Sequence, residues 1–276
     1  HIKDGVALTK FICWLKKNVG KIPMTELSAG EKLYSFRAQQ ENFIDNSFDP
    51  IISYGIHAAI NHYSATPETD IAIEPGNFLL ADTGGHYYEG TTDTTRTIVM
   101  GSVNDEQKKY FTAVLRGMLN LGNVKFRYGC TGVNLDYLAR GPLWEMGQDF
   151  NHGTGHGVGY LLNVHEGPNS FRWRIIQGDN AVLEEGMITS DEPGYYVENQ
   201  YGIRHENLLV CKKAEKTSFG QFMCFEHLTM VPFDLDAVVP ELMTVQERAL
   251  LNNYHAQVYK KISPYLEEEE KEWLKE

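Results

Sequence analysis

The amino-acid sequence predicts a single α+β domain of 276 residues built from two similar halves. Stretches with helical periodicity alternate with short strand-like stretches, in the order helices, strands, helices, strands. An apolar strand preceded by glycine and followed by an acid recurs, from Gly76 to Asp82 and from Gly186 to Glu192. Hydrophobic residues make up 42% of the chain, which is enough for a sizeable core.

Two helices open the first half, which we expect to cover about residues 1–125. The stretch HIKDGVALTKFICWL has the pattern of an amphipathic helix. Ser28 and Glu31 match a capping box, which predicts a second helix that turns Leu33 and Phe36 toward the core. Turn residues then separate four strand-like stretches, DPIISYG, GNFLLAD, GHYYEG and TTRTIVM.

The same order of elements then recurs along the chain. Helical periodicity returns in NDEQKKYFTAVLRGMLNLG and GVNLDYLARGPLWEMG, and strands resume from about Asn151 to Cys211. We place the junction of the halves near residue 125, the second half at about residues 126–235, and a C-terminal extension at about 236–276. The chain begins without Met and already in a helical pattern, so we expect it to be a fragment whose natural N-terminus lies upstream.

Charge and cysteine usage exclude several classes of protein. The formal net charge of −12 argues against nucleic acid as a partner, because phosphate backbones are bound by clustered Lys and Arg. No apolar run approaches the roughly 18 residues needed to span a membrane, and we expect no export signal. Widely spaced cysteines predict reduced, buried thiols and a cytoplasmic location; they are Cys13, Cys130, Cys211 and Cys224.

Acidic residues occupy matched positions at strand ends. They are Asp82 and Asp93 in the first half, Glu192 and Glu206 in the second. If these carboxylates converge, each close pair repels by about 4 kcal/mol at 4 Å and an effective dielectric constant near 20, so multivalent cations are the simplest remedy. Salt bridges to Arg96 and Arg204 are the structural alternative. Each half also carries a histidine, His62 in INHYS and His165 in NVHEG.

The stretch HGTGHGVGY at 152–160 places two histidines among four glycines. A zinc-binding helix is excluded, because each glycine costs a helix about 1 kcal/mol relative to alanine. A dinucleotide fingerprint would have to open a helix, whereas YLLNVHEGP follows. In an extended chain His152 and His156 point to one face, toward the acids if the halves meet there. The alternative is a glycine-rich turn with exposed histidines.

Four motifs together closely resemble the catalytic domain of Xaa-Pro aminopeptidases, within the pita-bread dinuclear metallopeptidases. They are LLADTGGHYYEGTTDTTRT, HGTGHGVGYLLNVHEGP, SDEPGYY and GIRHENLLV. The resemblance covers nearly the whole chain, including FEHLTMVPFDLDAV, which is similar to the segment after the catalytic core in the longer aminopeptidases P. It implies a pita-bread fold, with a curved antiparallel sheet and flanking helices in pseudo-twofold halves. Family members usually carry one or two further N-terminal domains, which we expect this chain to lack.

The resemblance also implies roles for individual residues. Five would bind the metal ions, with Asp93 and Glu206 bridging the pair: Asp82, Asp93, His156, Glu192 and Glu206. His62 and His165 match the catalytic histidines of the family, and Glu192 would handle the proton of the attacking water. His152 and Arg204 match positions that line the substrate site, and His62 is a further candidate for the wall of the proline pocket. His205 is assigned no role.

Five side chains serving two divalent ions leave coordination positions open, as catalysis requires. We therefore expect a hydroxide that bridges the two ions to attack the scissile carbonyl. The oxygen-rich ligand set favours Mn²⁺, with Co²⁺, Zn²⁺ or Fe²⁺ as alternatives. The expected substrates are peptides with proline in the second position, whose missing N–H and fixed φ require a fitted pocket.

Two rival functions stay open at this point. A prolidase has the same fold but cleaves only Xaa-Pro dipeptides. A catalytically silent pita-bread protein would instead bind a partner, although such relatives lose metal ligands and this chain keeps all five. The tract from Phe222 to Val231 fits either ordinary core or the interface of a homodimer.

Overall fold

The computed structural model describes residues 1–178 and 180–275, and it begins with the two expected helices. Helix α1 spans Ile2–Asn18 and α2 spans Glu26–Arg37. The predicted start of α2 is wrong by three residues. Thr25 is the N-cap, and it exchanges capping hydrogen bonds with Ser28, the third residue of the helix. Glu31 takes no part in this capping box.

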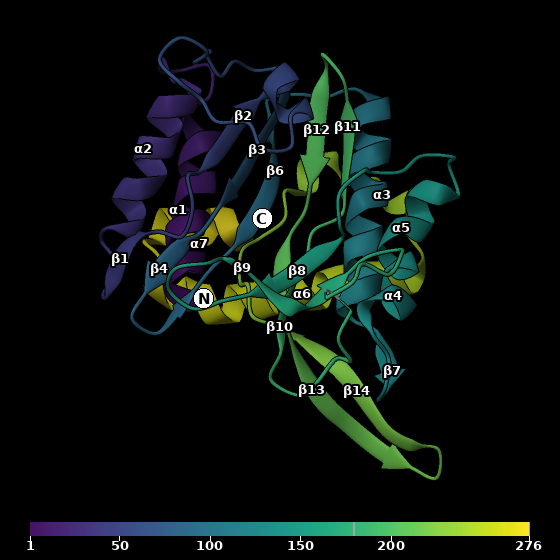
Figure 1. Cartoon of the computed structure of the whole chain (residues 1–276). Coiled ribbons are helices and arrows are strands. Elements are labelled where there is room, and N and C mark those ends of the chain that lie inside the picture. The colour runs from purple at the N-terminus through teal and green to yellow at the C-terminus, as the bar shows by residue number, and fades with distance from the viewer. Residues whose placement is uncertain (179, 276) are drawn as a thin grey trace.

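The first sheet lies against these helices and consists of buried strands (Figure 1). Its order is β2-β3-β6, all antiparallel, so β3 is central. The strands are β2 (Ile51–Tyr54), β3 (Asn77–Thr83) and β6 (Thr94–Met100). A smaller sheet beside it and a short 3₁₀ helix complete this half: β1 (Phe43–Asn46), β4 (Gly85–Tyr87), β5 (Gly90–Thr91) and η1 (Gly55–Ala59).

The second half contains helices α3 (Asp105–Gly122), α4 (Gly132–Leu135) and α5 (Tyr137–Trp144). The stretch expected to form one helix is thus two short ones, and α5 contains Pro142. The sheet order is β7-β14-β13-β10-β8-β9. Its strands are β7 (Lys125–Arg127), β8 (Gly155–Val158), β9 (His165–Phe171), β10 (Ile188–Asp191), β13 (Asn207–Thr217) and β14 (Gly220–His227), with a separate hairpin β11 (Gly194–Val197) and β12 (Tyr201–Arg204).

Strands continue well beyond Cys211, where the sequence pattern places their end. Strands β13 and β14 form a long hairpin that projects away from the rest of the molecule (Figure 1). The far end of this hairpin is largely exposed and contains few apolar residues, so the alternation of apolar and polar residues that predicts a strand is weak there.

The order of elements is the same in the two halves. In the first, β3 leads through β4 and β5 back to β6; in the second, β10 leads through the β11–β12 hairpin back to β13. Gly76 and Gly186 precede the equivalent strands β3 and β10, and both have a positive φ, 126° and 91°. Helices α3 and α5 pack together as α1 and α2 do. The order of elements thus starts again at α3, and the junction near residue 125 stays a prediction.

The halves meet along β6 and the segment between β12 and β13. The backbone N–H of Glu206 donates to the Thr95 carbonyl over 3.1 Å, and Thr97 Oγ1 donates to the Arg204 carbonyl over 2.9 Å. The buried guanidinium of Arg96 donates to the backbone of Thr95 and Glu206 and to the Asn207 side chain. Arg96 therefore holds the seam together and does not neutralise the clustered carboxylates.

The C-terminal region completes the core. Helix α6 (Val245–Ile262) packs against α3 and α1, and α7 (Glu268–Lys275) packs against α1. Three short 3₁₀ turns lie around α6: η2 (Leu235–Ala237), η3 (Pro240–Leu242) and η4 (Ser263–Tyr265). In the tract 222–231, Met223, Met230 and Val231 are buried. Core packing therefore accounts for these three residues.

All four cysteines are free, but only Cys13 and Cys211 are buried, whereas Cys130 and Cys224 are partly exposed. The expectation of four buried thiols is thus wrong for two of them. Cys224 lies on β14, in the projecting hairpin, and is half-buried. Among the described residues, none of the helices combines the length and the apolar composition needed to cross a membrane.

Candidate metal centre and substrate cleft

The first pair of acids lies at one end of the β3–β6 pair. Asp82 is opposite Thr95 in the register, and Asp93 directly precedes β6. Their exposed fractions are 8% and 3%, so both carboxylates are largely removed from water. Antiparallel pairing thus brings together two acids that are eleven positions apart in the sequence.

The second pair occupies the equivalent end of the β10–β13 pair. Glu192 follows β10, and Glu206 precedes β13. Ser190 Oγ donates to Glu192 Oε1 over 2.9 Å, and Thr95 Oγ1, from the other half, donates to Glu206 Oε2 over 2.7 Å. Each glutamate therefore has one oxygen oriented by a neighbouring hydroxyl.

His156 lies on β8 between the two pairs. Its Nε2 is 3.4 Å from Asp93 Oδ2 and 3.2 Å from Glu192 Oε1. Its Nδ1 is 2.9 Å from the Gly157 carbonyl, which only accepts, so Nδ1 carries hydrogen. In the neutral ring this leaves the Nε2 lone pair directed at the acids, as in a histidine that binds a metal.

Glycines bring β8 close enough to its neighbours for this contact. A Cβ on Gly155 would lie 1.8 Å from the Ser190 carbonyl oxygen, and one on Gly157 would lie 2.1 Å from that of Glu166. The middle of HGTGHGVGY, residues 155–158, is thus a strand with close backbone neighbours and not an exposed turn. His152 lies just before this strand, yet it lines the same cleft as His156.

The electrostatics of this cluster call for added positive charge. Burial, together with repulsion from Asp93, raises the pKa of Glu206 well above its usual range. Burial also raises the pKa of Asp93 to about 6. Although burial opposes a charged imidazole, contact with Asp93 and Glu192 raises the pKa of His156 to about 11. In the absence of other positive charge, these buried groups therefore bind protons more tightly than usual, which lowers the repulsion between the carboxylates.

The donor atoms form three groups, and in each group they lie within 4.8 Å of one another. The groups are Asp82, Asp93 and Glu206; His156, Glu192 and Glu206; and Asp93, His156 and His165. Asp93 and Glu206 each belong to two groups. Within the described part of the chain, Asp82 Oδ1 and Glu206 Oε1 are buried without a hydrogen-bond partner. A pair of divalent cations fits this arrangement, because it would satisfy these oxygens.

Arg204 supplies one of the positive charges from the protein itself. Its Nη2 donates to Asp82 Oδ2 over 2.6 Å, and its Nη1 donates to the Tyr196 hydroxyl over 2.8 Å. Tyr196 in turn lies 2.8 Å from Nε2 of His152. Since His152 Nδ1 is 2.8 Å from the Gly153 carbonyl and carries hydrogen, Nε2 accepts from the tyrosine.

Burial keeps His152 neutral, and the hydrogen bonds fix its orientation. Burial lowers the pKa of His152 to about 4, and burial raises the pKa of Tyr196 to about 12. One salt bridge from Arg204 to Asp82 cannot balance four carboxylates. The structural alternative, in which arginines alone neutralise the acids, is therefore inconsistent with the geometry.

All nine predicted site residues line one cleft of about 520 Å³. Besides the metal-ligand candidates, these are His62, His152, His165 and Arg204. The ring of His165 lies 3.8 Å from that of His156, centroid to centroid. Burial, followed by the nearby charge of His156, lowers the pKa of His165.

Several residues of the site were not predicted from the sequence. The main one is Tyr196, which is not part of the cleft lining but contacts two residues that are, His152 and Arg204. In the β11–β12 hairpin, Tyr196 is opposite Gly202 and Arg204 is opposite Gly194. Tyr196 and Arg204 therefore share a face and meet diagonally over residues without side chains. The glycine spacing in EPGYY and YGIR is a signal from which this contact could have been predicted. Phe48, Ile51, Asn61, Tyr63, Val164 and Arg172 also line the cleft.

Comparison with protein families matches the chain along nearly its whole length. The sequence profile of metallopeptidase family M24 matches residues 1–213, and that of the C-terminal region of peptidase M24 matches residues 221–276. "Probable Xaa-Pro aminopeptidase P" of Paracoccidioides brasiliensis (strain Pb03) is 43% identical over 282 residues, with 100% of this chain and 46% of that protein covered. The protein of the same name from Arthroderma otae is also 43% identical, with 100% and 45% covered. The chain spans about half the length of the curated relatives it matches.

Solved structures show the same relationship. The X-prolyl aminopeptidase of Caenorhabditis elegans, described as a cytosolic enzyme with a di-nuclear active site, has a TM-score of 0.93 at 37% identity, with 99% of this chain and 45% of that chain covered. The prolidase of Pyrococcus furiosus has a TM-score of 0.63 at 30% identity, with 76% and 59% covered.

Proposed function

Because the chain belongs to metallopeptidase family M24, with the pita-bread α+β fold, we propose that it is the catalytic part of an Xaa-Pro aminopeptidase. It would remove the N-terminal residue from peptides with proline in the second position. The observation that carries this proposal is the convergence of five donor side chains from both halves on one cleft. Asp82, Asp93, His156, Glu192 and Glu206 are the proposed metal ligands.

The three groups of donor atoms suggest how these residues would hold two ions. Asp82 would serve one ion, and His156 and Glu192 the other. The family resemblance implies that Asp93 and Glu206 are shared; membership of two donor groups does not by itself single them out, because His156 also belongs to two. Four carboxylates and one imidazole favour Mn²⁺ over softer cations. Divalent ions bound there would supply Lewis-acid activation of a water molecule and of the scissile carbonyl.

The side chains around the ligands would position the substrate and move its protons. Glu192 is the proposed general base, and the imidazoles of His62 and His165 are proposed to donate to the carbonyl oxygen, where negative charge develops. His152 is neutral and is oriented by Tyr196, so it can form a flat wall beside the proline ring without a charge to desolvate. His62 and Arg204 line the same cleft and complete the proposed substrate site.

The rival functions differ from this one in measurable ways. The C-terminal region, matched at residues 221–276, and the TM-score of 0.93 to an X-prolyl aminopeptidase favour that activity over a prolidase. The test is hydrolysis of an Xaa-Pro dipeptide, an Xaa-Pro-Yaa tripeptide and an Xaa-Ala-Yaa control by the Mn²⁺-loaded chain. Cleavage of the tripeptide after its first residue supports the proposal, and cleavage of the dipeptide alone would favour a prolidase.

A metal count separates both enzymes from a silent binding module. Mass spectrometry of the Mn²⁺-loaded protein should give about two ions per chain, since the donor groups favour two sites. A count near zero would support the binding module.

We extend the proposal to location and assembly. A cytoplasmic location is supported by four free cysteines and by the description of the C. elegans structure as cytosolic. A homodimer is proposed through the tract 222–231, in which Phe222 and Leu228 are partly exposed. Cell fractionation and light scattering would test these two statements.

A further inference from the structure

His62 differs from the other cleft histidines in how the fold holds it. His165 and His156 lie on paired strands, with His165 opposite Val158 in the register. His62 is exposed and lies between η1 and Thr66, in a segment that pairs with no strand in the described part of the chain. The turn closed by the Tyr63 N–H on the Ile60 carbonyl, at 3.1 Å, is its nearest backbone restraint.

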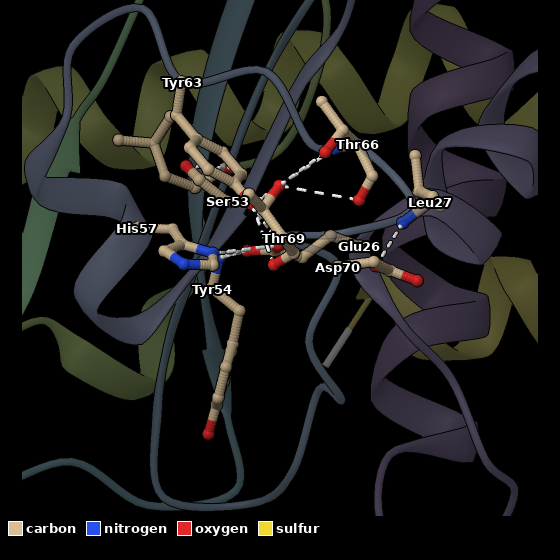
Figure 2. A network of polar contacts seen from close by, with 10 residues as sticks. Glu26, Leu27, Ser53, Tyr54, His57, Tyr63, Thr66, Thr69 and Asp70 are labelled. Carbon is tan, nitrogen blue, oxygen red and sulfur yellow. Dashed lines mark hydrogen bonds and ion pairs between the residues drawn. The ribbon is translucent and has the colours of Figure 1, made fainter.

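The carboxylate of Glu26, the first residue of α2, contacts this segment at Tyr63 and the chain just before it at Tyr54 and His57 (Figure 2). It accepts from the backbone N–H of Tyr54 over 2.7 Å and from the Tyr63 hydroxyl over 2.9 Å. Nδ1 of His57 lies 3.0 Å from both of its oxygens. Glu26 is only 1% exposed, so these partners replace water around a buried carboxylate.

The same helix turn also holds the far end of the segment. The N–H of Leu27 donates to Asp70 Oδ1 over 3.0 Å, and the N–H of Glu26 donates to the Ile71 carbonyl over 3.2 Å. The free N–H groups at the start of α2 are thus used to fix the chain on the other side of His62. Figure 2 shows the contact between Leu27 and Asp70 at the start of α2.

Tyr63 transmits this anchoring to its neighbour His62. Tyr63 is buried, with an exposed fraction of 7%, and its ring stacks on that of His57 at 4.3 Å. Its hydroxyl also lies 3.2 Å from Thr69 Oγ1. Burial raises the pKa of Tyr63 to about 12, so the hydroxyl keeps its proton and donates to Glu26. Because Tyr63 itself lines the cleft, its position and that of His62 are set together.

We propose that Glu26 is a positioning residue which, through Tyr63 and His57, fixes His62 against the cleft in the orientation the reaction needs. This inference rests on the proposed function for the role of His62, and on the structure alone for the anchoring. Glu26 touches none of the metal-ligand candidates, so its effect would run through the segment and not through metal binding.

Tyr63→Phe tests the proposal, because it removes one hydroxyl and keeps the stacked ring. Tyr54→Phe is the matched control, since its hydroxyl donates over 2.6 Å to the Glu74 carbonyl, outside the cluster. The chain should be compared as wild type, as each variant, as His62→Ala and as His62→Ala with Tyr63→Phe. We expect Tyr63→Phe to lower kcat roughly tenfold, since small displacements of a reacting group cost one to two powers of ten.

The double variant distinguishes positioning from general destabilisation. If Tyr63 acts through His62, then Tyr63→Phe has no further effect on kcat once His62 is alanine. The metal content should stay unchanged in all variants, and Tyr54→Phe should keep the wild-type kcat. An equal loss of kcat in both backgrounds would overturn the proposal. So would wild-type kcat in Tyr63→Phe.

Hydrogen exchange tests the anchoring without activity. The amide of Tyr63 should exchange faster in Tyr63→Phe and in Glu26→Gln than in Tyr54→Phe. Equal exchange in Tyr63→Phe and Tyr54→Phe would refute the anchoring, even if Glu26→Gln fails to fold. If the wild-type chain cleaves no Xaa-Pro peptide, the proposed function is refuted, and the exchange comparison alone decides the anchoring.

Discussion

Replacing Gly155 with alanine would test whether the close approach of β8 to β10 is what places His156 in the site. The added Cβ would lie 1.8 Å from the Ser190 carbonyl oxygen, whereas ordinary contacts begin at 3.4 Å. The shortfall is about 1.6 Å, and it is against backbone in a paired strand, so no flexible side chain can give way. Strand β8 must therefore move away from β10 and carry His156 with it.

The magnitudes follow from this displacement. Overpacking of a well-packed site costs about 1–3 kcal/mol, and each kcal/mol lowers Tm by roughly 2–4 °C in a chain of this size, so Tm should fall by about 2–12 °C. Moving His156 away from Glu192 should also reduce bound Mn²⁺ and lower kcat by about 100-fold. Circular dichroism melting, metal analysis and peptide hydrolysis measure these three effects.

Gly90→Ala is the control for this experiment. A Cβ at Gly90 would meet nothing within 4 Å, and its φ is not in the left-handed region. We expect that variant to match the wild type in Tm, metal content and kcat. If Gly155→Ala melts with Gly90→Ala and keeps its full metal content, the close strand contact does not set the position of His156.

Three further predictions concern the cleft, the pH response and the metal. Tyr196→Phe leaves Nη1 of buried Arg204 and Nε2 of His152 without their shared hydrogen-bond partner, which costs about 1–3 kcal/mol. Both Tm and kcat should therefore fall, and an unchanged kcat would show that this tyrosine has no role in the site. Burial lowers the pKa of His227 from 6.5 to about 4, so as pH falls the histidine is protonated in the unfolded chain before it is protonated in the folded one. Stability is therefore lost between pH 6.5 and 4. His227→Gln should make Tm depend less on pH in that window, and an equally steep curve would contradict this. Chelation should lower Tm, and Mn²⁺ at 100 times Kd should add about 2.7 kcal/mol per site; a Tm insensitive to both would argue against metal binding in the folded state.

The metal-ligand candidates were predictable because their signal is local. Each acid lies at the end of an apolar strand, so its partner on the paired strand follows from the alternation and the turn. The repeat from Gly76 to Asp82 and from Gly186 to Glu192 then indicated that two such pairs exist. That both pairs share one cleft depends on contacts such as Thr95 with Glu206, which no local pattern contains.

Other features depended on burial that the sequence does not display. Two overlapping capping boxes, beginning at Thr25 and at Ser28, are readable at the start of α2. The structure uses the first, because Glu26 must be the first helical residue to receive Tyr54, His57 and Tyr63. Helix α6, in contrast, is indicated in the sequence by the capping box of Thr244 and Glu247, although it is not among the helices predicted above.

The guanidinium of Arg96 also limits where the chain can be truncated. Besides the seam, it donates to the carbonyls of Val231 and Pro232 and to the Tyr254 hydroxyl. The C-terminal region matched at residues 221–276 is therefore tied to β6 by buried hydrogen bonds. A shortened protein ending near residue 213 would leave the buried guanidinium of Arg96 without these three partners. The backbone of Glu206, which Arg96 contacts, would then lose support although every proposed metal ligand is still present.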